Sequence, residues 1–64
     1  MTGDDFIKQA AGYAETGRAA LFNFDSKAPH AQMMLRRAWD HLTTAAENLR
    51  YAAQEFGMSD PRGG

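Results

Sequence analysis

The chain has 64 residues, 44% of them hydrophobic, with seven basic and eight acidic side chains and no cysteine. This length sets one domain as the upper limit and lies near the smallest size at which a single hydrophobic core supports folding. Without cysteine, disulfides and cysteine-bound metals are excluded, so self-association is the remaining common stabilising device. The net charge of −1 gives no strong field for nucleic acid or an anionic membrane.

Hydropathy along the chain argues against a membrane or secretory role. No apolar run approaches the ~20 residues that a membrane-spanning helix needs. The first residues, MTGDDFIK, are acidic and lack the basic-then-apolar order of a signal peptide. We therefore expect a cytoplasmic protein that makes no membrane contact.

In chain order, the first predicted element is a helix over residues 3–24. Thr2 can cap its N-terminus, and Asp4 and Asp5 lie in its first turn, where carboxylates interact favourably with the helix dipole. Its apolar and small residues recur at helical spacing along one face. That face consists of Phe6, Ile7, Ala10, Tyr13, Ala14, Gly17, Ala20, Leu21 and Phe24.

The stretch NFDSKAPH, residues 23–30, predicts a break followed by a second helix over residues 28–57. Asp25 and Ser26 form turns and caps, and Pro29 fits the first turn of a following helix but cannot continue a preceding one. Gly57 suits the left-handed position just past a helix end. Residues 58–64 are predicted to form a flexible tail. The short connection predicts a single all-α domain, residues 1–64, folded as an antiparallel helical hairpin.

The second helix has an unusually broad apolar face. Small and large residues alternate along it at steps of three and four, and a second apolar row runs beside the first. The first row contains Ala31, Leu35, Ala38, Leu42, Ala45, Leu49, Ala52 and Phe56, and the second contains Trp39, Ala46 and Ala53. Polar residues, including Asn48, are expected on the opposite face.

Two such rows are wider than the seam of a two-stranded coiled coil, so one neighbouring helix cannot cover them. We therefore expect both rows to mediate self-association. The simplest closed assembly is a homodimer in which two hairpins form an antiparallel four-helix bundle. A heteromeric helical bundle is the alternative that the sequence leaves open.

Few residues offer the chemistry of an active site. Asp40 and His41 are adjacent in sequence, but neighbours on a helix point roughly 100° apart. Neither His30 nor His41 has a glutamate three residues before it, as the helical di-iron sites require. We therefore predict a non-enzymatic protein with no catalytic residue, no metal site and no cofactor.

The residues left outside the predicted core are candidate contacts for a protein partner. Phe22 and Met33 flank the same loop, which suggests a docking patch at the hairpin tip. Arg36 and Arg37 belong to a basic ridge, and Tyr51 is an aromatic residue on the polar side. These five residues predict a small adaptor protein that self-associates and binds another protein.

The basic ridge, which also contains Arg50, has a second interpretation as a phosphate-contacting surface. The acidic residues Asp40 and Glu47 are interleaved with it, which argues against binding nucleic acid. The same ridge is also compatible with solvated charges held in local ion pairs.

The chain resembles two known families, the first over its whole length and the second over a short motif. The size, the hairpin plan and the Phe56–Gly57 ending resemble Rop, a family of dimeric four-helix bundles that bind paired RNA loops through their first helix. This resemblance implies an RNA-binding regulatory dimer as an alternative function, although Lys8 and Arg18 are the only bases of the first helix here.

The sequence YAAQE at Tyr51–Glu55 is similar to the Tyr-x-x-x-Asp/Glu export signal of small WXG-type hairpins. It implies a secreted hairpin as a second alternative. The Trp-x-Gly turn of that family is missing, since Trp39 lies inside the second predicted helix.

Overall fold

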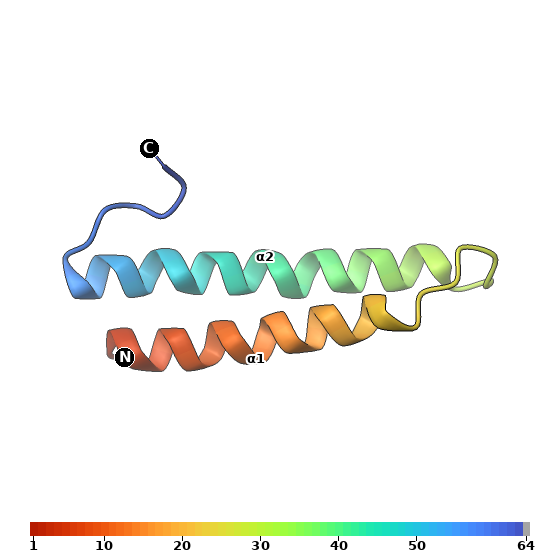
Figure 1. Ribbon diagram of the computed structural model, residues 1–64, viewed down its shortest axis with the longest axis horizontal. Helices are drawn as coiled ribbons and strands as arrows, with labels where there is room; N and C mark the ends of the chain where they lie inside the picture. Colours follow the sequence, from red (N-terminus) through yellow and green to blue (C-terminus); the bar gives the residue numbers. More distant parts are fainter. Residues whose placement is uncertain (64) are drawn as a thin grey trace.

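The computed structural model describes residues 1–63 and contains two helices, α1 (Gly3–Phe22) and α2 (Ala31–Phe56), joined by residues 23–30. The helices run antiparallel, and the tail after α2 turns back above it (Figure 1). The molecule measures 45 × 23 × 14 Å, so it is a flat hairpin one helix deep. The predicted all-α hairpin is confirmed for the described residues, which contain no strand.

The start of α1 is fixed by the predicted cap. The Thr2 hydroxyl accepts a hydrogen bond from the Asp5 N–H at 3.2 Å, and the Asp5 carboxylate accepts one from the Thr2 N–H at 3.2 Å. This reciprocal pair is a capping box, which satisfies amide groups that the helix itself leaves unpaired. The helix ends at Phe22 rather than residue 24, and the Phe24 N–H closes a final turn onto the Leu21 carbonyl at 3.1 Å.

The second helix begins at Ala31 rather than at the predicted residue 28. The Asp25 carboxylate accepts a hydrogen bond from the Lys27 N–H at 2.9 Å, and the Asp25 carbonyl accepts one from Ala28 at 3.1 Å. Asp25 therefore closes a turn within the linker instead of capping α2. The N-cap position falls to His30, whose side chain makes no capping hydrogen bond.

The end of α2 agrees with the sequence. Gly57 has a φ of 69°, in the left-handed region. The Gly57 N–H donates to the Gln54 carbonyl at 3.1 Å, and the Met58 N–H donates to the Ala53 carbonyl at 2.8 Å, the arrangement of a Schellman motif. Beyond it, Arg62 donates hydrogen bonds to the Asp60 carboxylate and thereby lowers the pKa of that group.

The two helices meet through rows of small residues spaced seven apart. The buried positions of α1 are Gly3, Ala10 and Gly17, and the buried alanines of α2 are Ala38, Ala45 and Ala52. A Cβ atom added at Gly17 would lie 2.9 Å from the Leu42 Cγ, and one added at Gly3 would overlap the Phe56 ring. The absence of side chains at these two glycines therefore allows the helices to approach closely.

Two alanine substitutions are expected to test this close approach. Gly12→Ala meets no atom within 4 Å, so it should stabilise the hairpin by about 0.5–1 kcal/mol through helix propensity. Gly17→Ala gains the same propensity but crowds Leu42, so it should be less stable than Gly12→Ala by about 1–3 kcal/mol. Thermal denaturation of both variants measures the difference, and equal stabilisation would show that the helices do not touch at Gly17.

The structure corrects the predicted placement of Asn48. This residue was expected on the polar face of α2, but only 7% of it is exposed. The small row of α1 fits against one edge of the apolar face of α2 rather than its centre, which brings Asn48 into the interface. The same rotation brings the Tyr51 ring, also expected on the polar side, to 5.5 Å from the Phe6 ring.

Candidate functional site

The packing of α1 on one edge of α2 gives the hairpin two different flanks. One is an aromatic flank, where Phe6 pairs with Tyr51 and Tyr13 lies 6.1 Å from His41 between ring centroids. Residues three and four positions beyond a buried residue lie on opposite sides of it. The opposite flank therefore carries aliphatic residues of both helices, which we call the leucine face. It consists of Ile7, Ala14, Leu21, Leu35, Trp39, Leu42, Ala46, Leu49, Ala53 and Phe56.

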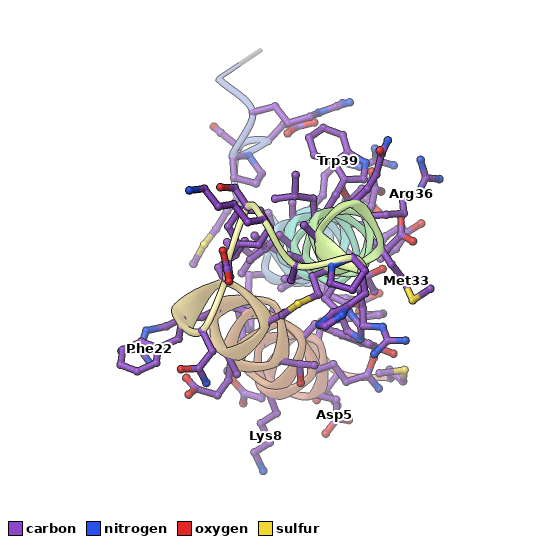
Figure 2. The ribbon with its side chains drawn as sticks, turned by 90° about the vertical axis from the view of Figure 1, so that its right-hand side faces the viewer. Asp5, Lys8, Phe22, Met33, Arg36 and Trp39 are labelled. Carbon is purple, nitrogen blue, oxygen red and sulfur yellow. The ribbon has the colours of Figure 1, made fainter. Side chains whose placement is uncertain are left out.

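The leucine face is open to solvent. Leu35, Leu42 and Leu49 are 48%, 40% and 43% exposed, and Phe56 is 43% exposed. Trp39 is 66% exposed and points away from α1 (Figure 2). Large apolar side chains are thus exposed together along one flank of the hairpin.

The residues predicted to mediate self-association therefore divide into two groups. Ala38, Ala45 and Ala52 are buried within the hairpin, against α1. The larger residues of the set form the exposed leucine face, together with Ala46 and Ala53. Two of these larger residues also contact α1, since Leu42 lies against Gly17 and Phe56 lies against Gly3.

An open groove of about 620 Å³ extends the leucine face toward the loop. Phe24 and Ala31 line it beside Leu35 and Trp39, and Arg36 lies at its edge. This groove combines an apolar floor with one cationic group.

The candidate partner contacts do not form one surface. Phe22 and Met33 are 76% and 62% exposed, but they point to opposite sides of the hairpin (Figure 2). The joint patch expected at the hairpin tip is therefore not formed, because α1 and α2 present these positions on opposite flanks. At helical spacing, Met33, Arg37 and Tyr51 share the aromatic flank.

Two of the three arginines predicted as a ridge, Arg36 and Arg50, are engaged in local ion pairs. Arg36 lies 3.3 Å from Asp40, and Arg50 lies 3.4 Å from Glu47. The Arg50 guanidinium also lies 5.6 Å from the centroid of the Tyr51 ring. These contacts neutralise part of the charge that a phosphate would meet.

His41 is half-buried beside a shallow cleft of about 460 Å³ lined by Gln9, Gly12, Tyr13 and Thr16. Its Nδ1 lies 2.7 Å from the Arg37 carbonyl oxygen. Because a carbonyl only accepts hydrogen bonds, Nδ1 carries a proton and donates it. Asp40 pairs with Arg36 rather than with His41. Among residues 1–63, no three histidine or acidic side chains lie close enough together to hold a metal ion.

Neither α1 nor α2 combines the length and the hydropathy required to cross a membrane. Comparison with known proteins gives no relative: no family model, no curated protein and no solved structure matches this chain. The leucine face and the aromatic flank are therefore interpreted from their own geometry.

Proposed function

We propose that this chain is a small, non-enzymatic helical interaction protein that self-associates through its leucine face and binds a protein partner with the surface that remains. The observation that carries the proposal is the half-exposed row of Leu35, Leu42, Leu49 and Phe56. Homodimer interfaces are richer in apolar area than the rest of a protein surface, and this row lies on a long, rigid helix.

Self-association would place the hairpins in two layers. A single hairpin leaves one side of its apolar residues in water, and a second hairpin laid on the leucine face would complete an antiparallel four-helix bundle. Burial of a half-exposed leucine contributes about 1 kcal/mol or more, so a row of such residues supplies enough free energy for association.

The protein partner would then meet the aromatic flank. Met33, Arg37 and Tyr51 lie there, so they stay accessible when the leucine face is covered. Met33 is flexible and Tyr51 is held against Phe6 and Arg50, a combination of adaptable and rigid contacts that suits protein recognition. Phe22 borders the leucine face instead, and Arg36 is held by Asp40.

The mass in solution tests self-association directly. Sedimentation across micromolar concentrations is expected to show a species of twice the 7.1 kDa chain mass. Trp39, the only tryptophan, should shift its fluorescence to shorter wavelength as the dimer forms, because its ring leaves water. The double variant Met33→Ala, Arg37→Ala is the control, since it should keep the dimer mass. A single-chain mass at every concentration would refute self-association.

A further inference from the structure

The leucine face carries a row whose side chains differ in size in a specific order. Trp39, Ala46 and Ala53 lie seven residues apart on the outer edge of α2, so they are in line along the helix. Trp39 is 66% exposed and has the largest side chain of the row, whereas Ala46 is exposed and Ala53 is partly exposed, each with a single methyl group. The row therefore has a large side chain at one end and small side chains in the middle and at the other end.

We propose that this row is the dimer axis: a second copy of the chain lays its α2 antiparallel on the first, with a two-fold axis passing beside Ala46. This inference rests on the proposed self-association and specifies its geometry. Ala46 then meets Ala46 of the second copy, and each Trp39 covers Ala53 of the other chain. A two-fold axis requires such an exchange of contacts between the two copies.

The flanking row agrees with the same axis. The antiparallel register that centres on Ala46 places Leu42 against Leu49 of the second copy and Leu35 against its Phe56. In the central row each Trp39 therefore faces an alanine, while the large residues of the flanking row pack side by side next to it. A parallel contact would instead stack the two Trp39 rings and leave both Ala53 positions empty.

The charges at the edge of the face favour the antiparallel arrangement. It places each Arg36 beside the C-terminus of the facing α2, the negative end of a helix dipole, and α2 has no basic residue of its own in its last turn. Each Arg50 falls near Thr43 of the other copy. A parallel contact would put Arg36 against Arg36 and Arg50 against Arg50.

The available area is sufficient for a dimer. The large residues of the leucine face, at their exposed fractions of 40–66%, present roughly 700 Å² of apolar surface in each copy. A stable protein interface buries about 800 Å² per partner. The small residues and the groove beside Trp39 add to this area, so a second copy can fill the face without any further segment.

Cysteine cross-linking tests the axis, and the chain suits the method because it has no cysteine of its own. Ala46→Cys places two thiols face to face across the axis, at a separation that a disulfide can span between closely packed helices. Ala53→Cys is the matched control on the same row, because its two thiols would lie roughly 20 Å apart along the helices. Gly12→Cys, at an open position of α1, measures random collision.

Under mild oxidation at micromolar concentration, Ala46→Cys is expected to cross-link at least about tenfold faster than Ala53→Cys or Gly12→Cys, since association raises the effective thiol concentration toward millimolar. Excess unmodified chain should slow the Ala46→Cys reaction. Equal rapid cross-linking of Ala46→Cys and Ala53→Cys would indicate a parallel contact and overturn the inference.

The remaining outcomes separate this inference from the proposed function. Slow cross-linking of all three variants, with dimer mass retained, would overturn the axis but leave self-association standing. A single-chain mass at every concentration would overturn both the axis and self-association.

Discussion

Glutamate in place of Ala45 is expected to unfold the hairpin. Ala45 is 6% exposed and lies in the middle of the seam between α1 and α2, where a carboxylate would be removed from water. Burial of an unpaired charge costs about 3–5 kcal/mol, a large part of the stability of a domain this small. Circular dichroism at 25 °C should show a loss of helix content and no cooperative thermal transition.

Thr44→Glu is the matched control for this variant. Thr44 is the preceding residue, is exposed, and donates a hydrogen bond to the Asp40 carbonyl at 2.9 Å. The same charge one position away should therefore change stability by no more than about 0.5 kcal/mol. If Ala45→Glu melted like Thr44→Glu, the seam between the helices would lie on another face of α2.

Glutamate in place of Ala46 is expected to give the opposite result, a folded hairpin that does not dimerise. Ala46 is exposed in the single chain, so the carboxylate stays in water and the helix content should match that of the unmodified chain below its dimer dissociation concentration. At the proposed two-fold axis, however, two carboxylates would be forced together. A penalty of about 3–5 kcal/mol weakens association by roughly 100-fold to 1,000-fold or more.

Sedimentation equilibrium combined with circular dichroism distinguishes this outcome from unfolding. Thr44→Glu again serves as the control and should retain the dimer. An Ala46→Glu chain that kept the mass of the unmodified dimer would exclude Ala46 from the contact between copies. The neighbouring alanines 45 and 46 thus report separately on the two interfaces.

Local signals in the sequence were sufficient to predict the hairpin. Thr2 and Asp5 mark the start of α1 through a capping box, and Gly57 marks the end of α2 through a left-handed conformation. These features depend on residues within one helical turn, so they can be recognised without knowledge of tertiary contacts. The predicted start of α2 was less accurate, because Asp25 can either cap a helix or close a turn and the sequence does not distinguish these roles.

The rotation of α2 about its axis could not be predicted in the same way. Hydrophobicity alone predicts that the seam is centred between the alanines and the leucines of the first apolar row of α2. In the structure the seam is centred on Ala38, Ala45 and Ala52 and includes Asn48. The rotation of α2 depends on which of its edges fits the shape of the row of small residues on α1. The spacing of Gly3, Ala10 and Gly17 was the available signal, since a row of small residues at steps of seven marks a close helix contact.

The patch expected from Phe22 and Met33 failed for a related reason. Proximity to the same loop places two residues at the same end of the hairpin but does not determine the direction in which each points. That direction follows from the rotation of each helix, and it places the two side chains on opposite flanks.

The reliance of the seam on glycine and alanine has a calorimetric consequence. No large side chain of the described residues is fully buried, so melting one chain by itself would newly hydrate little apolar surface. The heat-capacity increment and the enthalpy of that transition should both be small, which gives a broad melting curve. A sharp transition would require the additional dry surface that a second copy supplies, so its midpoint should rise with protein concentration.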